Sequence, residues 1–192
     1  VVAEAVSIAK ATGWKAPIKV QWTRENDMRG GRYRPAYVHR MQAGLDKDGN
    51  IVAWRHHIVG QSIVAGTPFQ GMIKDGVDPT SVEGASTLPY AIPNLAVGLT
   101  TTNVGVPVLW WRSVGSTHTA YATETFLDEV AAAAGKDPVA RRMELLATHP
   151  GHAAVLKRAA AATTTNELGA IKGGERAAEP ELPRVVPKIP ID

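Results

Sequence analysis

The stretch Val108-Leu-Trp-Trp-Arg-Ser-Val-Gly-Ser-Thr-His-Thr119, which continues directly into Ala120–Ala134, says most about the fold of this chain. Its apolar start predicts a strand, the Arg-Ser-Val-Gly segment predicts a turn, and the alanine-rich segment predicts a helix. A turn that leads into a helix directs backbone N–H groups and the positive end of the helix dipole toward an anionic ligand. This stretch is therefore the candidate binding element.

Length and composition indicate a globular domain. The chain has 192 residues, 44% of them hydrophobic, and a formal net charge of +3. Lys and Arg are scattered apart from two small local groups, so we expect no nucleic-acid partner. The absence of cysteine excludes disulfides, thiolate metal sites and iron–sulfur ligation within this chain. No run reaches the roughly 18 to 20 apolar residues of a membrane span.

The chain begins at Val1 within a helical pattern, without an initiator methionine. A basic segment followed by an apolar one, which would indicate a signal sequence, is not present at this end. We interpret the chain as a fragment, and the compartment is left open.

The first third of the sequence predicts a helix, a strand and a polar loop. Apolar residues recur at helical spacing through residues 1–12, and Gly13 follows as a stop signal. Ile18–Trp22 alternates between apolar and polar residues, as strands do, and Thr23–Asp27 is expected to lead out of it into a loop rich in glycine and arginine.

A β-hairpin is expected next. Val38–Leu45 and Ile51–Val59 have strand patterns, and the residues between them include Gly49, which supplies the positive φ of a tight connection. Residues 60–93 contain closely spaced Gly and Pro residues and predict a loop. A loop of that length inside a domain is usually functional.

The second half predicts strands and then helices. The expected elements are strands at Leu95–Thr101 and Val106–Trp111 and helices at Thr119–Ala134 and Val139–Leu146. Together the patterns indicate an α+β fold: a mixed sheet with a hairpin, flanked by an N-terminal helix and a C-terminal helix pair. Residues 159–192 are rich in Ala, Thr, Glu and Pro, so an irregular, poorly packed tail is expected there.

The histidines favour structural roles. His149 and His152 have a ligand-like spacing, but the Pro-Gly between them predicts a turn and no acidic ligand follows. His56 and His57 point to opposite faces of a strand. At most one of them is therefore buried, and we interpret it as a structural histidine.

The carboxylates divide into two groups. Glu25 and Asp27 share one side of an extended chain, which suits acid–base chemistry, but pairing with Arg29 or Arg32 is the favoured interpretation. Glu83 has no basic neighbour in the sequence and lies in the long loop. It is a candidate site residue.

Trp110 and Trp111 are expected to face opposite sides of their strand, one in the core and the other over a ligand. Arg112 then supplies a fixed cationic donor, and Ser113–Thr117 supplies small residues whose N–H groups can approach an oxyanion or phosphate. A tight strand-to-helix turn without a ligand explains the same residues equally well.

Several motifs occur in a characteristic order over residues 1–158. They are Gln21-Trp-Thr-Arg-Glu-Asn-Asp-Met28, Tyr33-Arg-Pro-Ala36, the Asp-Gly hairpin, Val82-Glu-Gly-Ala85, Leu88-Pro-Tyr-Ala-Ile-Pro-Asn94, Trp111-Arg-Ser-Val-Gly115 and Glu124-Thr-Phe-Leu-Asp-Glu129. This series resembles the molybdopterin-binding large subunit of the xanthine dehydrogenase and aldehyde oxidase family, and within it the isoquinoline 1-oxidoreductase beta subunits. Residues 1–158 would then be a partial molybdopterin-binding domain.

The resemblance implies a molybdenum hydroxylase that oxidises N-heterocycles or aldehydes with water as the oxygen source. It implies molybdopterin, in the cytosine dinucleotide form, with molybdenum held by the pterin rather than by protein side chains. It also implies a small iron–sulfur (2Fe-2S) subunit as partner and favours the bacterial periplasm or cell envelope. The chain alone is expected to be inactive.

The resemblance also assigns residues. Trp111, Arg112, Ser113 and Gly115 fall on the cofactor-binding segment, in which the family arginine lies beside the oxygen ligands of the metal. Val114 falls where relatives carry an aromatic residue against the substrate, and Glu83 falls near the loop that holds substrate.

The sequence also departs from the family. Xanthine-type members read Arg-Gly-Phe-Gly followed by Pro-Gln, whereas this chain has Ser113 and Val114 and continues with Ser116 and Thr117. Gly173-Gly-Glu175 resembles the family's Gly-x-Gly-Glu segment only weakly, so the role of catalytic base is not assigned to Glu175. The alternative is a truncated, non-enzymatic structural or subunit-interaction module, and the adjoining coding sequence would separate the two.

Overall fold

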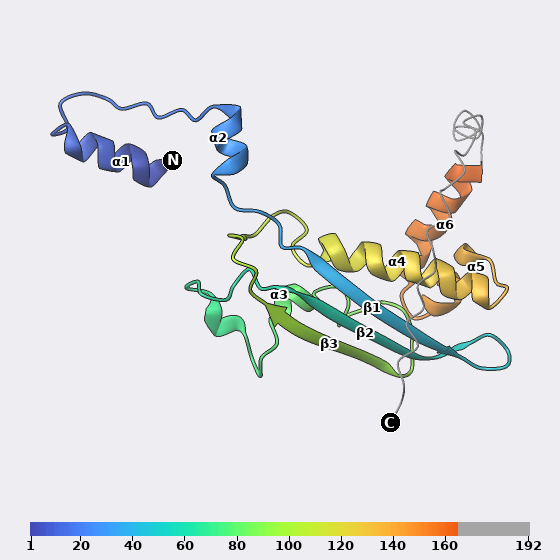
Figure 1. The fold of residues 1–192 in the computed structure, drawn as a ribbon. Helices are drawn as coiled ribbons and strands as arrows, with labels where there is room; N and C mark the ends of the chain where they lie inside the picture. The colour runs from blue at the N-terminus through green and yellow to red at the C-terminus, as the bar shows by residue number, and fades with distance from the viewer. Residues whose placement is uncertain (165–192) are drawn as a thin grey trace, which may run out of the picture.

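The computed structural model describes residues 1–164. Its elements are α1 (Val2–Ala11), α2 (Arg24–Arg29), β1 (Tyr37–Leu45), β2 (Ile51–Gln61), the 3-10 helix η1 (Gln70–Met72), α3 (Pro79–Val82), β3 (Leu95–Thr102), α4 (Ser116–Ala133), α5 (Pro138–Leu145) and α6 (Pro150–Thr164). Figure 1 shows α4 running along the sheet, with α5 and α6 toward the end where β1 turns into β2. The α+β fold is confirmed.

The three strands form one mixed sheet in the order β1-β2-β3. β1 and β2 are antiparallel and form the predicted hairpin, with Gly49 at φ 76° in the connection. β2 and β3 are parallel, with Trp54 opposite Leu95. A parallel pair needs a crossover, and the long Gly/Pro-rich segment supplies it and carries η1 and α3.

The main core lies between the sheet and the helices α4 and α5. Ile51 and Trp54 on β2 pack with Leu127 and Val130 on α4 and with Leu145 on α5. Leu127 and Val130 are three residues apart and share one face of α4. Ile51 and Trp54 are also three apart, and the register shift of the hairpin, which pairs Gly44 with Ala53 but Leu45 with Ile51, breaks the strand alternation between them. This packing fixes α4 across the sheet, and α4 begins at the candidate turn.

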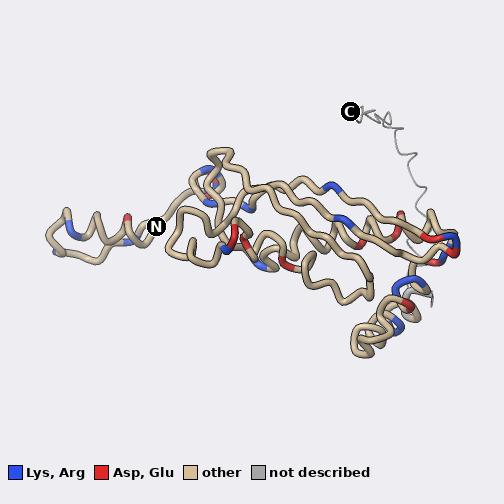
Figure 2. The backbone as a smooth tube through the Cα atoms, turned by 90° about the horizontal axis from the view of Figure 1, so that it is seen from below, with Lys and Arg blue, Asp and Glu red and all other residues tan. Residues whose placement is uncertain are grey.

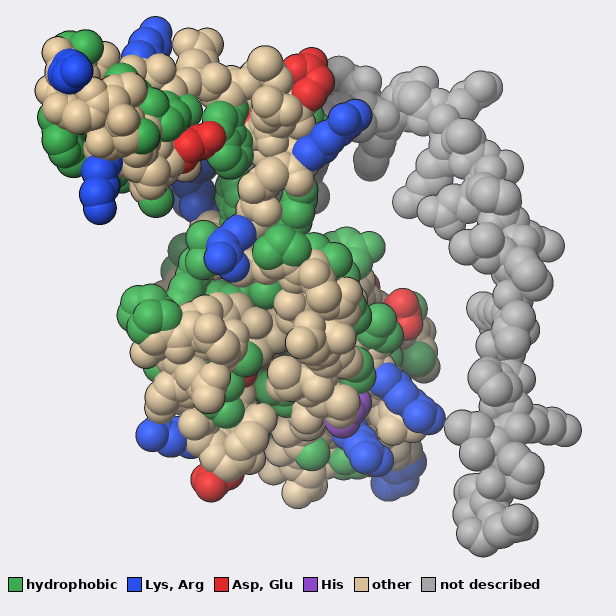
Figure 3. All heavy atoms as spheres, turned by 60° about the vertical axis from the view of Figure 1, so that its left-hand side comes forward, with side chains coloured by type: hydrophobic (Ala, Val, Ile, Leu, Met, Phe, Trp, Pro, Cys, Tyr) green, Lys and Arg blue, Asp and Glu red, His purple; other side chains and the backbone are tan. Residues whose placement is uncertain are grey.

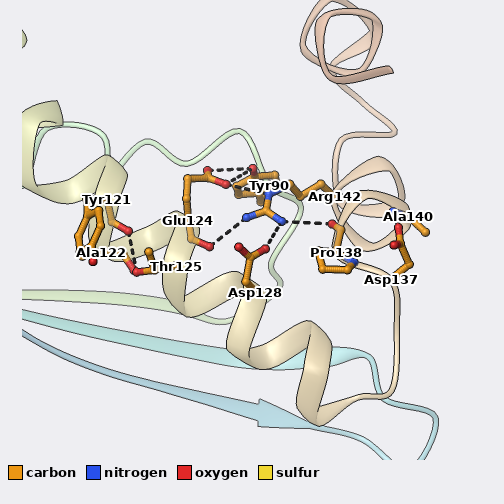
Figure 4. Close-up of polar contacts among 10 residues, drawn as sticks. All are labelled: Tyr90, Tyr121, Ala122, Glu124, Thr125, Asp128, Asp137, Pro138, Ala140 and Arg142. Carbon is orange, nitrogen blue, oxygen red and sulfur yellow. Dashed lines mark hydrogen bonds and ion pairs between the residues drawn. The ribbon is translucent and has the colours of Figure 1, made fainter. Parts of the chain in front are cut away.

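Arg142 joins α5 to α4 and to the loop before β3 (Figure 4). Its Nε donates to Glu124 Oε2 over 2.8 Å and its Nη1 donates to Asp128. Tyr90 Oη donates to Glu124 Oε1 over 2.9 Å. These contacts close the helical end of the sheet, away from the candidate turn.

Ile18–Trp22 is not a strand, which corrects the sequence prediction. The segment keeps its alternation of half-buried and exposed residues, but no strand of the described part of the chain lies beside it, so it forms no ladder there. The expected strand exit at Thr23–Asp27 is also wrong, because these residues start the helix α2. Thr23 accepts a hydrogen bond from the backbone N–H of Asn26 and caps α2, as N-cap residues do.

Val106–Trp111 is not a regular strand either. It makes one parallel bridge, Tyr33 with Val108. Pro107 has no N–H and only accepts a hydrogen bond, from Tyr33 N, while Leu109 N donates to Tyr33 O. α4 also begins at Ser116, three residues before the predicted start, because the turn is already helical there.

The opening helix is confirmed as α1, and Figure 1 shows it apart from the sheet. Figure 3 shows this N-terminal segment as a lobe joined to the rest of the chain by a narrow connection. Trp22 Nε1 donates to Glu4 Oε2 over 2.8 Å and ties the segment together. Several apolar side chains on it are exposed, Val2 by 79% and Trp14 by 64%.

The predicted irregular tail, residues 159–192, falls in two parts. α6 continues to Thr164, so its first residues are helical, because an alanine-rich run has high helix propensity. The remainder, with Gly173-Gly-Glu175, lies outside the described residues. Within residues 1–164 no helix has both the length and the apolar character of a bilayer span. Acidic and basic residues are interleaved along the chain (Figure 2).

Gly60 offers a direct test of the sheet packing. A Cβ there would overlap the ring of Tyr37, whereas a Cβ at Gly44 of the same hairpin meets its nearest atom, Ala53 Cβ, at 3.6 Å. Gly60→Ala is expected to lower the free energy of unfolding by about 1–3 kcal/mol. Gly44→Ala should change it by less than about 0.5 kcal/mol in urea unfolding. Equal effects would contradict this packing.

Candidate functional site

The turn Trp111–Gly115 has an unusual backbone. Ser113 lies at φ 66° and Val114 at φ 37°. Residues other than glycine seldom adopt positive φ, and a β-branched residue there is a real outlier that costs about 1–3 kcal/mol. Such strain persists only where the surroundings impose it, and it gathers at binding sites.

The surroundings that impose this conformation come from α3. Gly115 is buried, and a Cβ on it would meet the carbonyl oxygen of Thr80 and lie 2.8 Å from Cβ of Glu83. The backbone N–H of Gly115 donates to Glu83 Oε2 over 2.8 Å, and Thr119 Oγ1 donates to the Glu83 carbonyl oxygen over 2.6 Å. The turn is therefore clamped against α3.

This contact bears on Ser113–Thr117, the segment expected to bind an anion through its backbone N–H groups. A carboxylate of the chain itself, that of Glu83, occupies the position at the N-terminus of α4 where the Gly115 N–H points. A negative charge is favoured there by the helix dipole. The Gly115 N–H, one of the donors expected in the segment Ser113–Thr117, is therefore already hydrogen-bonded within the protein.

Arg34 holds the turn from the other side. Its Nη1 donates to the carbonyl oxygen of Arg112 over 2.9 Å and to Thr117 Oγ1 over 2.7 Å. Its guanidinium carbon lies 5.9 Å from the ring centre of Trp111, a cation–π distance. Arg34 therefore fixes both the backbone and the aromatic wall of the turn.

The side chains of the turn divide between core and solvent. Trp110 packs edge-on against Phe69 and joins the buried cluster beneath the turn. Trp111 is 52% exposed. Arg112 is exposed, and its guanidinium makes no hydrogen bond or ion pair with any residue that the structure describes. It is available to an external anion.

A small, shallow hollow of about 40 Å³, open on one side, adjoins the turn. Its lining residues are Arg34, Pro35, Tyr37, Ile63, Thr80, Leu109, Trp111, Val114, Gly115, Thr117 and His118. Of the predicted site residues, Trp111, Val114 and Gly115 line it, Arg112 and Ser113 lie on the turn beside it, and Glu83 lies behind Gly115.

A chain of three histidines, which the sequence did not predict, ends at this hollow. His56 Nε2 lies 2.7 Å from His39 Nδ1, and His39 Nε2 lies 3.2 Å from His118 Nδ1. The ring of Tyr37 stacks on His118 with centroids 3.7 Å apart. We call His56, His39 and His118 the histidine chain.

The prediction that one of His56 and His57 is buried is confirmed. His56 is fully buried, whereas His57 is partly exposed and bonds Thr100 Oγ1 over 2.9 Å. Strand alternation alone could place His39 and His56 on one face of the hairpin. No local pattern relates either to His118, which lies on another element.

The histidine chain is neutral at pH 7. Burial lowers the pKa of His39, and burial together with the neighbouring histidines lowers the pKa of His56 and of His118 to about 4. Each neutral ring has one N–H donor and one bare acceptor nitrogen. The three rings can therefore form a continuous hydrogen-bonded line.

A buried network connects this line to α3. The carboxylate of Asp78 accepts hydrogen bonds from the hydroxyls of Ser62, Thr80 and Ser81, and the hydroxyls of Tyr37 and Ser81 lie 2.9 Å apart. Asp78 also caps α3. The network therefore positions α3, which in turn clamps the turn.

The remaining candidates lie elsewhere. Glu25 and Asp27 are in the first turn of α2, and their predicted pairing with the neighbouring arginines does not occur among the described residues. A hydrogen bond with its own backbone N–H and one with Thr23 lower the pKa of Glu25. The two carboxylates are therefore acidic residues in the first turn of a capped helix and do not form the predicted ion pairs.

His149 and His152 lie at the start of α6 with their rings edge-on at 5.6 Å. In the part of the chain that the structure describes, no cluster of three or more His, Asp or Glu side chains is arranged to hold a metal ion.

The described residues form a domain of mixed α and β structure, and comparison with known proteins shows its family. Residues 1–146 match the molybdopterin cofactor-binding domain. The chain belongs to this family of molybdopterin cofactor-binding domains.

Several curated proteins are similar to it. The beta subunit of isoquinoline 1-oxidoreductase from Brevundimonas diminuta is 30% identical over 89% of this chain and 22% of its own length. One nicotinate dehydrogenase subunit of Pseudomonas putida is 29% identical over 76% of the chain and 12% of its own length. The molybdenum-binding PaoC subunit of an Escherichia coli aldehyde oxidoreductase is 31% identical over 67% of the chain and 16% of its own length. The chain spans less than a quarter of each relative.

The lowered pKa values of the histidine chain predict a pH dependence of stability. Unfolded histidines titrate near pH 6.5, so between about pH 6.5 and pH 4 the unfolded state binds more protons than the folded state. The free energy of unfolding should be constant above about pH 7 and fall as the pH drops through that window.

Urea unfolding between pH 7 and pH 5 isolates this effect from most carboxylate titration. His56→Phe should make the slope shallower because one of the perturbed groups is removed. A free energy of unfolding that is independent of pH over this range would contradict a neutral, buried histidine chain.

Proposed function

We propose that this chain forms one wall of the molybdenum site in the large subunit of a molybdenum hydroxylase. In this proposal Trp111, Arg112, Ser113 and Gly115 contact the molybdopterin cofactor. The observation that carries it is the unpaired Arg112 guanidinium, presented by a strained turn beside a hollow in a chain of this family.

The residues present suit such a group. A guanidinium without a protein partner is a strong donor for the anionic oxygens of a cofactor. The exposed face of Trp111 covers flat groups, and Arg34 keeps that ring in place. Because a pterin holds molybdenum through its own sulfurs, the site requires no protein metal ligands.

Substrate contacts are proposed for two further residues, Val114 and Glu83. Val114 lines the hollow and gives it an apolar wall. Glu83 uses Oε2 to hold Gly115, while its Oε1 makes no hydrogen bond among the described residues. We propose that Val114 packs against the substrate and that Glu83 faces it through the free oxygen.

The reaction proposed for the complete enzyme is the hydroxylation of an N-heterocycle or aldehyde: R–H + H₂O → R–OH + 2 H⁺ + 2 e⁻. The bound molybdenum–pterin group, in its cytosine dinucleotide form, supplies the two-electron redox chemistry. A small iron–sulfur (2Fe-2S) subunit takes the electrons, since a cluster needs cysteine thiolates and these 192 residues contain none. The isoquinoline and nicotinate enzymes among the relatives support a heterocyclic substrate.

Arg112→Ala in the complete, molybdenum-loaded subunit tests the assignment. Removing one donor that stabilises developing charge typically costs about 100-fold in rate, so kcat/KM should fall by about that factor or molybdenum should be lost. Arg55→Ala, which removes an exposed arginine from β2, is the matched control and should leave both unchanged. Full turnover with full molybdenum content in Arg112→Ala would overturn the assignment.

A further inference from the structure

The histidine chain has an unpaired atom at each end. His118 Nε2 and His56 Nδ1 are both buried and have no hydrogen-bond partner among residues 1–164. Buried polar groups are normally satisfied, so unsatisfied ones need an explanation. One of these two atoms belongs to a residue that lines the hollow, and the other lies in the core.

The two ends are coupled through the hydrogen bonds between the rings. Either all three rings carry hydrogen on Nε2, and His118 offers an N–H donor at its free end, or all three carry it on Nδ1, and His118 offers a bare nitrogen. In the second arrangement His56 Nδ1–H is an orphaned donor in the core. Buried orphan N–H groups are rarer than under-satisfied acceptors, so the first arrangement is favoured once His118 Nε2–H finds an acceptor.

Several other polar groups of the hollow already have partners within the protein. The hydroxyl of Tyr37 bonds the carbonyl oxygen of Gln61 and lies against Ser81, and Arg34 Nη1 bonds the turn. Among the described lining residues, only His118 has a buried side-chain nitrogen or oxygen without a partner. The rest of the lining includes Ile63, Leu109, Trp111 and Val114, an apolar surface that suits the edge of a flat ring while the rest of the molecule projects from the open side.

We propose that His118 recognises the substrate: its Nε2–H donates a hydrogen bond to the ring nitrogen of a neutral N-heteroaromatic molecule, while His39 and His56 hold it in that tautomer. The identity of this molecule as substrate rests on the proposed function. A cationic ligand is disfavoured, because Arg34 lies at the same wall.

The test is ¹⁵N NMR of the histidine rings in the full 192-residue chain at neutral pH, which reports the protonated nitrogen of each ring. Isoquinoline, added in steps, should bind saturably and shift His118, His39 and His56 together toward hydrogen on Nε2. Naphthalene has the same shape without the ring nitrogen and should cause no such shift. An equal response to both compounds, or no response to isoquinoline, would overturn the proposal.

Variants separate recognition from coupling. His118→Phe keeps a ring against Tyr37 and should weaken isoquinoline binding by about five- to tenfold, the value of one hydrogen bond. His39→Phe should let isoquinoline shift His118 while His56 no longer responds. His149→Phe, outside the histidine chain, is the control and should match the unmodified protein. Unchanged binding in His118→Phe would overturn the proposal.

The outcomes distinguish this inference from the proposed function. If Arg112→Ala abolishes turnover but isoquinoline leaves the histidines unchanged, His118 is not the recognition residue and the cofactor assignment stands. If isoquinoline shifts the histidines but Arg112→Ala retains turnover and molybdenum, the ligand site stands and the cofactor assignment fails.

Discussion

The hydrogen bond from the Gly115 backbone N–H to Glu83 Oε2, together with the absence of room for a Cβ at Gly115, holds the candidate site in place. It presses the turn against α3 and keeps Ser113 and Val114 at positive φ, where they would not stay by preference. Because the turn is fixed in this way, Arg112 is presented to solvent and Trp110 is held in the core. The backbone strain is confined to the turn, and the contacts that maintain it come from residues about thirty positions away in the sequence.

The elements around that bond are held by polar networks rather than by apolar packing alone. Asp78 orders α3, Arg34 fixes the carbonyl oxygen of Arg112, and the histidine chain runs from the buried face of the hairpin to the first turn of α4. The contacts of Asp78 and of the histidine chain are buried or partly buried, and low local polarity makes them strong when satisfied and costly when not. Among the described residues that line the hollow, the one buried side-chain atom left without a partner is His118 Nε2, and a ligand gains most there.

The sequence predicted the elements whose signals are local. Alternation and Gly49 predicted the hairpin, and helical spacing with an Asp-Pro start predicted α5. The same alternation wrongly predicted a strand at Ile18–Trp22. A strand also needs a neighbouring strand to pair with, and no local sequence pattern shows whether one is present. The turn was recognised from Arg112 to Gly115, but its clamp was not, since Glu83 reaches Gly115 only after the chain has folded. The link between the hairpin histidines and His118 is invisible for the same reason.

The most direct test of the clamped turn is the molybdenum-to-protein ratio of the complete subunit in two variants of Glu83. Glu83→Gln keeps an oxygen that accepts from the Gly115 N–H, so the ratio should match that of the unmodified protein. Glu83→Ala removes the acceptor and releases the turn, so the ratio should fall severalfold. An undiminished ratio in Glu83→Ala would contradict the claim that this clamped turn forms part of the cofactor site.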